Sequence, residues 1–278
     1  MSVEAVPPLP ANPGPPDRQP VLSMHGISKS FGKVQALTDI HLDIHPGEVV
    51  AIVGDNGAGK STLVKILAGV HPADDGEIEF DGMPVSIPDP TASRSLGIAT
   101  VFQDLALCDN LDVVANLFLG RELATAALDE EEMEKRAWEI LRQLSARIPS
   151  VRVPIAALSG GQRQTVAIAR SLIGNPRVVI LDEPTAALGV AQVAEVLNLI
   201  ERLRERGHAV VLISHNMADV QAVADRIFVL RLGRNNGDFL ASDVGYEDII
   251  AAITGATEHA RPRPAPVYPA PRRIGPNP

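Results

Sequence analysis

The amino-acid sequence predicts an α/β fold with a mostly parallel sheet at its centre. Three runs of consecutive apolar residues, 49–53, 178–181 and 209–213, have the length and composition of strands that are buried on both faces. Amphipathic helical patterns alternate with these runs, which is typical of a parallel sheet covered by helices on both sides. We therefore expect the three apolar strands in the middle of this sheet.

Several weaker patterns complete the prediction. Residues 22–28 and 36–44 alternate apolar and polar side chains, which predicts half-buried strands ahead of the first apolar run. Short strands are also expected at 76–80 and 97–102, and together these segments make a first half that is rich in strands. From about residue 104 to residue 160 the pattern becomes helical, which predicts a helical insertion.

Composition limits the class of protein. The chain has 278 residues, a net charge of −9 and a single cysteine, Cys108, which excludes an internal disulfide and a cysteine-rich metal site. No apolar run approaches the roughly 18 residues that cross a bilayer, and no signal peptide is evident, so we expect a cytosolic location. The acidic balance argues against broad nucleic-acid binding.

Proline-rich segments occupy both ends of the sequence. Residues 1–20 and 257–278 contain many prolines and few large apolar side chains, which predicts disordered tails. A proline-rich ligand for a recognition domain is the alternative for either tail. The ordered domain is expected to span residues 21–256.

A glycine-rich motif follows the first apolar run and precedes a helical pattern. It matches G-x-x-x-x-G-K-[ST], which in this strand-to-helix context is typical of a phosphate-binding loop. Glycines let several N–H groups surround one phosphate, and the positive end of the following helix dipole points to the same place. We expect Lys60 to reach the β- and γ-phosphates, Ser61 to ligate Mg²⁺ and Thr62 to contact phosphate. The predicted nucleotide site consists of Gly54, Asp55, Asn56, Gly57, Ala58, Gly59, Lys60, Ser61 and Thr62.

Two adjacent carboxylates, Asp182 and Glu183, follow the second apolar run. Ligands bind at this edge of an open parallel sheet, so Asp182 could hold Mg²⁺ while Glu183 orients and deprotonates the attacking water. His215 follows the third apolar run at the same edge and could donate a hydrogen bond to the γ-phosphate. The sequence therefore predicts a site for hydrolysis of a nucleoside triphosphate.

A pentapeptide at residues 158–162 reads Leu-Ser-Gly-Gly-Gln and lies between the phosphate-binding loop and the strand that ends at Asp182. With these motifs the chain resembles the ATP-binding cassette (ABC) proteins over about residues 21–255. The resemblance implies a P-loop ATPase fold in which an antiparallel β subdomain and a helical subdomain, at about 104–160, accompany the parallel core. It also implies that two cassettes dimerise head to tail, so that the ATP of one meets the signature residues of the other, Ser159, Gly160, Gly161 and Gln162.

The resemblance assigns roles to further positions. Phe31 matches the aromatic residue that stacks on adenine, and Gln103 matches the glutamine that senses Mg²⁺ and the membrane partner. Asp182 matches the Mg²⁺ carboxylate, Glu183 the general base and His215 the switch histidine. One position departs from the family pattern, because Gly189 stands where an aspartate is usual. This puts the coupling between the two ATP sites of a dimer in doubt, although not hydrolysis itself.

Four strings, at residues 54–60, 102–107, 116–122 and 185–190, are similar to ATP-binding subunits of bacterial ribose, xylose and fructose importers. This likeness implies an ATPase that uses ATP and Mg²⁺ to power sugar import through a separate transmembrane permease. The other implied partners are a second cassette, most simply a second copy of this chain, and, indirectly, an extracytoplasmic sugar-binding protein. The chain is expected on the cytoplasmic face of the membrane, without nucleic acid.

Three alternatives remain at this point. An exporter ATPase shares the catalytic residues, so the sequence leaves the direction of transport open. A soluble ABC ATPase acting on nucleic acid or ribosomes usually has paired cassettes, long coiled-coil insertions or zinc motifs, and none is visible here. A kinase or GTPase is disfavoured, because the pentapeptide has no role there and no Asn-Lys-x-Asp motif occurs. The sequence does not specify which sugar is carried.

Overall fold

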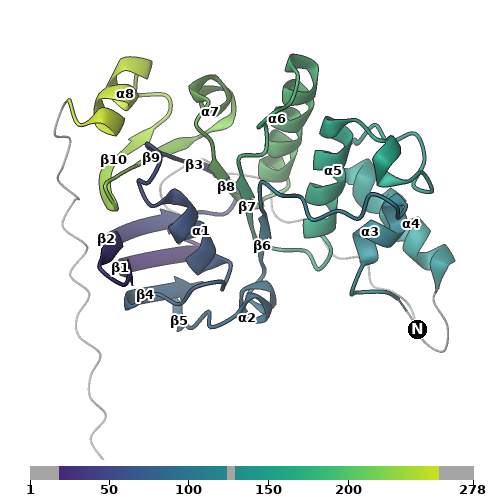
Figure 1. Ribbon diagram of the computed structural model, residues 1–278, viewed down its shortest axis with the longest axis horizontal. Helices are drawn as coiled ribbons and strands as arrows, with labels where there is room; N and C mark the ends of the chain where they lie inside the picture. The colour runs from purple at the N-terminus through teal and green to yellow at the C-terminus, as the bar shows by residue number, and fades with distance from the viewer. Residues whose placement is uncertain (1–18, 124–128, 257–278) are drawn as a thin grey trace, which may run out of the picture.

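A six-stranded sheet lies at the centre of the structure, a computed structural model that describes residues 19–123 and 129–256 (Figure 1). Its five neighbouring strands β9, β3, β8, β7 and β6 run parallel, and β10 pairs antiparallel at one edge. The three apolar runs form β3, β8 and β7 inside the sheet, which confirms the prediction. In spatial order the strands are β10 (Arg234–Leu240), β9 (Arg226–Arg231), β3 (Val49–Val53), β8 (Ala209–Ile213), β7 (Val178–Asp182) and β6 (Ile98–Val101).

A second sheet is four-stranded and antiparallel, as the family resemblance implied. The segments expected at 76–80 and 97–102 fall into different sheets, because β6 pairs with β7 rather than with β4. Buried side chains of both sheets, such as Ile27 and Ile52, form one apolar cluster. The strands of this sheet, in spatial order, are β2 (Val34–Ile44), β1 (Leu22–Phe31), β4 (Asp75–Phe80) and β5 (Met83–Val85).

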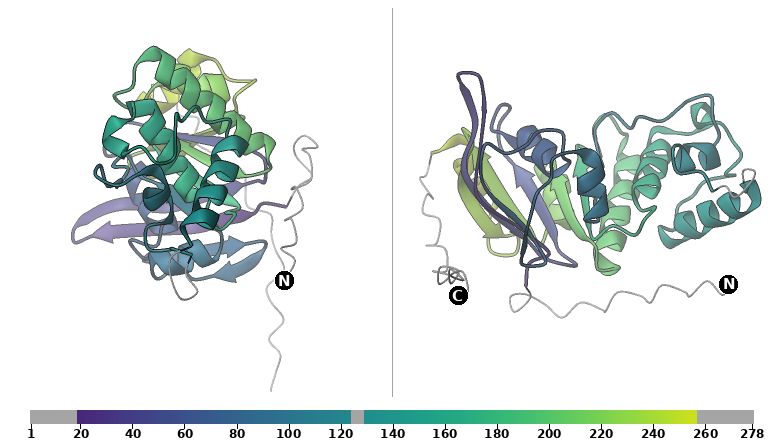
Figure 2. Two further views of the ribbon diagram at one scale, coloured as in Figure 1. Left: turned by 90° about the vertical axis from the view of Figure 1, so that its right-hand side faces the viewer. Right: turned by 90° about the horizontal axis from the view of Figure 1, so that it is seen from below.

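The helices cover the six-stranded sheet and extend beyond its β6 edge, where α3, α4 and α5 gather at one end of the molecule (Figures 1 and 2). In α4, Met133, Ala137 and Leu141 are spaced by four residues and are buried, so this helix packs through one apolar stripe. Within the described residues no helix combines the length and apolar character needed to span a bilayer. The helices are α1 (Lys60–Leu67), α2 (Pro90–Ser95), α3 (Val113–Phe118), α4 (Glu130–Gln143), the 3-10 turn η1 (Ile155–Ala157), α5 (Gly160–Ser171), α6 (Val190–Glu205), α7 (Met217–Val223) and α8 (Tyr246–Thr254).

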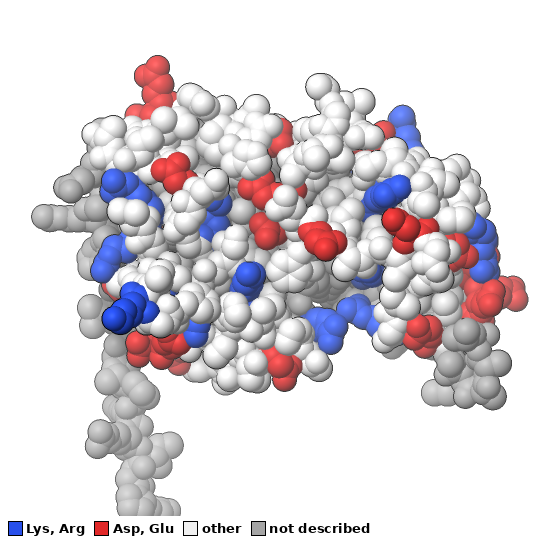
Figure 3. Space-filling model, in the orientation of Figure 1, with Lys and Arg blue, Asp and Glu red and all other residues white. Residues whose placement is uncertain are grey.

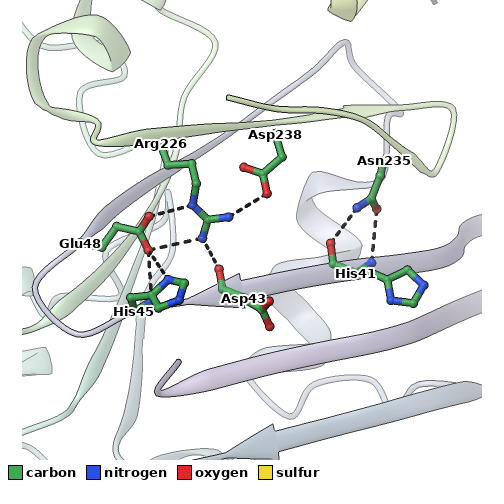
Figure 4. A network of polar contacts seen from close by, with 7 residues as sticks. All are labelled: His41, Asp43, His45, Glu48, Arg226, Asn235 and Asp238. Carbon is green, nitrogen blue, oxygen red and sulfur yellow. Dashed lines mark hydrogen bonds and ion pairs between the residues drawn. The ribbon is translucent and has the colours of Figure 1, made fainter. Parts of the chain in front are cut away.

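Polar contacts join the two sheets at an arginine, Arg226, whose side chain is 12% exposed (Figure 4). Arg226, at the start of β9, donates from Nε to Oε1 of Glu48 at 2.7 Å and from Nη2 to the backbone carbonyl of Asp43 in β2. A second link runs from Nδ2 of Asn235 in β10 to the carbonyl of His41 in β2, at 2.7 Å. These contacts hold β2 against the β9–β10 hairpin.

The proline-rich tails expected at 1–20 and 257–278 lie almost wholly outside the described residues, so their disorder stays a prediction.

Candidate active site

The glycine-rich loop connects the fully buried strand β3 to helix α1. Gly54, Gly57 and Gly59 all have positive φ angles, of 151°, 81° and 108°. A Cβ atom on Gly59 would lie 2.9 Å from the backbone oxygen of Ala36, and one on Gly54 would overlap the carbonyl oxygen of Leu230. The loop therefore requires glycine for both conformation and space, and Gly59 leads directly into the N-terminus of α1, where anions are stabilised.

The side chain of Lys60 folds back over this loop. Its Nζ atom donates to the carbonyl oxygens of Gly54 at 2.6 Å and of Asp55 at 3.0 Å, and the residue is only 9% exposed. Burial lowers the pKa of Lys60, while the negative charges of Glu183, Asp55 and Asp182 oppose that shift. Within residues 19–123 and 129–256 Lys60 forms no ion pair, and a phosphate group in the loop would supply an anionic partner in direct contact. Among the other residues of the loop, Ser61 is exposed and Thr62 is half-buried, so both hydroxyls remain accessible. Asp55 and Asn56 are exposed, whereas Ala58 is buried.

The turn between β9 and β10 forms backbone hydrogen bonds with the phosphate-binding loop. The sequence analysis did not predict this contact. The N–H group of Gly233 donates to the carbonyl of Ala58 at 3.0 Å, and its own carbonyl accepts from the N–H of Thr38 in β2 at 2.7 Å. Gly233 has a φ angle of 72°, and a Cβ there would lie 2.6 Å from the oxygen of Ala36. The turn between β9 and β10 thus ties the loop to β2.

Asp182 and Glu183 lie at the carboxyl end of β7, the same edge of the sheet at which β3 enters the loop. Burial raises the pKa of Asp182 and the neighbouring charge of Glu183 raises it further, while Lys60 and Lys65 act in the opposite direction. The two carboxylates and Lys60 are therefore close enough for their charges to interact at this edge of the sheet.

Glu183 is held in a fixed position beside His215. Its backbone has a φ angle of 51°, and its N–H group donates to the carbonyl of Ile213 in β8 at 2.9 Å. Nδ1 of His215 lies 2.8 Å from Oε2 of Glu183, yet the two groups are not aligned for a hydrogen bond, so this buried oxygen has no donor. Once the exposed His215 side chain moves away, the carboxylate can accept a hydrogen bond or a proton from a bound water.

The donors at this edge fit a magnesium ion that is completed by phosphate and water. Asp182 and Ser61 offer oxygen ligands, and Gln103 is exposed just after β6. Within residues 19–123 and 129–256, no group of three or more His, Cys, Asp and Glu side chains could hold a metal ion by itself. Mg²⁺ is commonly bound by one or two carboxylates together with waters and substrate phosphates, which matches this sparse set of protein ligands.

The signature pentapeptide caps the start of α5. The Oγ atom of Ser159 accepts from the N–H of Gln162 at 3.3 Å, and Oε1 of Gln162 accepts from the N–H of Ser159 at 3.0 Å, so the two residues form a capping box. A Cβ on Gly161 would lie 3.0 Å from Cβ of Gln192, at the start of α6. Ser159 and Gly160 are exposed, which leaves the positive end of the helix open to an anion.

A cavity of about 270 Å³ joins parts of the predicted site. It is lined by Gln103, Glu183 and Gly160, among other residues, but neither Lys60 nor Ser159 borders it. In Figure 1, α1 and α5 lie on opposite sides of strands β6 and β7. The phosphate-binding loop and the signature helix of one chain are therefore separate, and they do not form one phosphate site within the molecule.

Two further predicted positions lie at the periphery. Phe31 ends β1 with 44% of its surface exposed, and its ring meets the His71 ring in a T-shaped contact at 5.2 Å between centroids, while Nζ of Lys29 lies 5.6 Å from its centroid. Gly189 precedes α6 with a φ angle of −74°, which any residue adopts, and a Cβ there would find nothing nearer than 4.0 Å. The structure therefore does not require glycine at position 189.

Comparison with known proteins settles the family. Residues 37–186 match the sequence profile of the family described as ABC transporter, which is more than half of the chain. The chain belongs to the ABC transporter family. It is an ATP-binding cassette that hydrolyses ATP to drive transport, and this bears out the sequence-based assignment of fold and ATPase activity.

Individual relatives of this cassette are similar along most of its length. The fructose import ATP-binding protein of Rhizobium meliloti is 44% identical over 253 residues, which cover 88% of this chain and 97% of that protein. The xylose/arabinose import ATP-binding protein of Sulfolobus acidocaldarius is 44% identical over 235 residues, covering 84% and 94%. A putative ribose/galactose/methyl galactoside import ATP-binding protein of Burkholderia lata is 42% identical, but the cassette spans only 50% of its length.

A solved structure shows the same fold in a dimer. The dimeric post-hydrolysis state of an ATP-binding cassette bound to ADP and Pi superposes with a TM-score of 0.68 at 29% identity, covering 81% of this chain and 100% of that chain. Cassettes of this family thus dimerise, which agrees with the separation of the two phosphate-binding elements in this chain.

Proposed function

We propose that this cassette is the ATP-hydrolysing subunit of a carbohydrate importer and works on a separate transmembrane permease. The observation that carries the proposal is that this chain is 44% identical to a fructose import and to a xylose/arabinose import ATP-binding protein. The alignments cover 84–88% of this chain and 94–97% of those two relatives. We assign the ATPase domain to residues 21–256 and its helical subdomain to about 104–160.

ATP binding is assigned to the loop of residues 54–62 and to Phe31. Phosphate oxygens replace the carbonyl groups that Lys60 Nζ now contacts, and the amide groups at the start of α1 donate to the same phosphates. The half-exposed ring of Phe31 offers a face on which adenine stacks.

Hydrolysis is assigned to Glu183 as general base. After His215 turns away, a water aligned by the Glu183 carboxylate attacks the γ-phosphorus, the bond to the bridging oxygen breaks, and the carboxylate takes up the proton of the water. His215, 71% exposed at its side chain, turns from Glu183 to donate a hydrogen bond to the γ-phosphate. Mg²⁺ would be held by Ser61, Asp182 and Gln103 and supplies charge neutralisation for the phosphates when bound.

Two protein partners follow from this assignment. A second cassette, most simply another copy of this chain, presents its exposed signature residues Ser159 and Gly160 to the ATP of the first, as the known dimeric relative supports. The permease is placed next to Gln103 and the helical group α3–α5, so that the cassette sits on the cytoplasmic face of the membrane. An extracytoplasmic sugar-binding protein then contacts the permease alone.

Replacement of Glu183 by glutamine tests the catalytic assignment. The variant should bind ATP as wild type but lose at least about 100-fold in turnover, because the general base typically contributes 10²–10⁴-fold. Glu195→Gln is the matched control, since Glu195 is exposed on α6 and has no ion pair within the described residues. Wild-type turnover in Glu183→Gln would remove Glu183 from this role.

The importer assignment is tested by deleting the gene for this chain and measuring the uptake of individual sugars by the cells. Loss of uptake of one sugar is the expected result.

A further inference from the structure

Among the acidic residues in the described part of the chain, only Asp219 is buried. Most of the others lie at the surface, where Figure 3 shows acidic side chains interspersed with basic ones. Asp219 lies in the first turn of α7, is 5% exposed and forms no ion pair within residues 19–123 and 129–256. A buried carboxylate without a cation is destabilising unless hydrogen bonds offset its loss of water. The contact that Asp219 makes is therefore essential to it.

The hydrogen-bond donor to Asp219 is a second buried side chain. Oγ1 of Thr185, a residue that is 9% exposed, donates to Oδ2 of Asp219 at 2.7 Å. Thr185 lies two residues after Glu183, in the segment that follows β7. Asp219 lies four residues after His215, in the segment that follows β8. The bond thus joins the two segments that carry the proposed catalytic side chains.

The segment that carries Glu183 has a strained backbone. Glu183 and Ala187 have φ angles of 51° and 60°, a conformation that is unfavourable for residues other than glycine. Such strain persists where surrounding contacts fix the backbone. The N–H group of Glu183 donates to the carbonyl of Ile213, at the end of β8, and the Thr185–Asp219 bond adds a second tie to the same neighbouring segment. Loss of this side-chain bond should therefore let Glu183 shift.

The His215 side chain stands on the same segment as Asp219 but is 71% exposed. Before it, the buried Ser214 accepts a hydrogen bond at Oγ from the N–H of Asn216 at 3.1 Å, and after it α7 begins at Met217. The imidazole can turn from Glu183 toward a γ-phosphate while Asp219 stays in place. The anchor of the Glu183 segment thus lies outside the part that has to move.

We propose that Thr185 and Asp219 form a positioning pair that keeps the Glu183 carboxylate in place while His215 turns to the γ-phosphate. Both residues act through Glu183 and not by contact with ATP. The inference rests on the proposed function, because it takes Glu183 as the general base. Loss of the bond should lower kcat and leave ATP affinity unchanged, since other contacts hold the phosphate-binding loop.

ATP turnover of variants of the full chain tests the pair. Thr185→Val keeps the shape of the side chain and removes its hydroxyl, so kcat should fall roughly tenfold while the ATP dissociation constant, measured by calorimetry, stays within about twofold. Thr185→Ser and Asp219→Asn retain a donor and an acceptor and should keep most of the turnover. Ser93→Ala is the matched control, because Ser93 is 2% exposed in α2 and its Oγ also donates at 2.7 Å, to the carbonyl of Leu67. It should lose stability but keep the wild-type kcat.

The Glu183→Gln background separates positioning from a general loss of structure. If Thr185 acts through Glu183, Thr185→Val should lower kcat little further once Glu183 is replaced, because no base is left to position. A tenfold loss in both backgrounds would overturn the inference. Wild-type kcat in Thr185→Val, with Glu183→Gln inactive, would also overturn it and leave the proposed function standing. Wild-type turnover in Glu183→Gln would instead refute the proposed base, and the inference with it.

A double variant keeps the test decisive if Thr185→Val does not fold, since that change leaves Asp219 buried without its donor. Thr185→Val/Asp219→Leu replaces both partners by apolar side chains, which is often nearly neutral for stability. We expect it to unfold in urea closer to wild type than Thr185→Val does, and still to have a roughly tenfold lower kcat, because an apolar contact lacks the direction of a hydrogen bond. Wild-type kcat in this double variant would show that the pair serves stability alone.

Discussion

Replacement of Glu48 by glutamine should destabilise the protein in a pH-dependent way. Glu48 precedes β3 and accepts hydrogen bonds from Arg226 at 2.7 Å and from the backbone N–H of His45 at 3.1 Å (Figure 4). Burial alone would raise the pKa of Glu48, but the contacts with His45 and Arg226 lower it from 4.5 to about 2. Glutamine preserves the shape of the side chain and removes its charge, so the change isolates this electrostatic contribution.

The magnitude follows from the pKa shift. At about 1.4 kcal/mol for each pKa unit, a carboxyl group whose pKa falls from 4.5 to about 2 on folding stabilises the native state by about 3 kcal/mol at neutral pH. Because the folded-state pKa is the lower one, this contribution is complete above pH 4.5 and is lost as the pH falls toward 2. Arg226 would keep one acidic partner, Asp238, whose Oδ2 lies 2.8 Å from its Nη1.

Urea unfolding followed by circular dichroism at pH 7, 5 and 3 measures the effect. The difference in unfolding free energy between wild type and Glu48→Gln should be about 3 kcal/mol at pH 7, almost the same at pH 5 and clearly smaller at pH 3. Glu77→Gln is the control, because Glu77 is exposed in β4 and should change stability by less than about 0.5 kcal/mol. A loss that is the same at all three pH values would show that packing, and not the charge of Glu48, holds the sheets together.

Two further predictions concern the turn behind the phosphate-binding loop. Gly233→Ala should weaken ATP binding roughly tenfold, about 1.4 kcal/mol, because its Cβ would push the turn away from Ala36 and the loop. Gly174→Ala carries the same backbone strain, with φ of 99° and open space around it, so it should lose stability but keep wild-type ATP affinity in calorimetry. Equal ATP affinity of the two variants would contradict a supporting role for Gly233. Leu232→Asn should raise the free energy of unfolding in urea by about 0.5–1 kcal/mol. Leu232 is 76% exposed and has a φ angle of 49°, a conformation that asparagine tolerates better than leucine. A lower free energy of unfolding would mean that the leucine side chain makes a stabilising contact.

The parts of the site that sequence could predict are those whose chemistry is local. The loop at residues 54–62 is recognisable because strand, glycines and helix follow one another, and the capping box of Ser159 and Gln162 spans only four residues. Asp182 and His215 were placed at one sheet edge because parallel strands present their carboxyl ends together. In each of these cases the geometry is determined within a few residues of the motif.

The supporting contacts were missed because they join distant parts of the chain. Arg226 meets Glu48 across 178 residues, and periodicity carries no information about such a pairing. The sequence analysis also predicted no elements after residue 215, although the apolar run at 227–230 was a usable signal for β9, which pairs with β3. Strand β10 reads Arg-Asn-Asn-Gly-Asp-Phe-Leu and lacks an apolar pattern, so its pairing with β9 was not visible in advance.

The two sides of the ATP site are held by different kinds of contact, and this decides which of them a single change can loosen. The loop at residues 54–59 is fixed by close backbone contacts with β9, β2 and Gly233, so moving it would break several interactions at once. The segment after Gln103 is tied by two hydrogen bonds from one guanidinium that also faces an open groove. The segment after Gln103 therefore depends on one partly exposed side chain, whereas the turn at Gly233 is buried and held by backbone contacts. Loss of the Arg170 guanidinium should therefore loosen residues 105–106 while the phosphate-binding loop stays as it is.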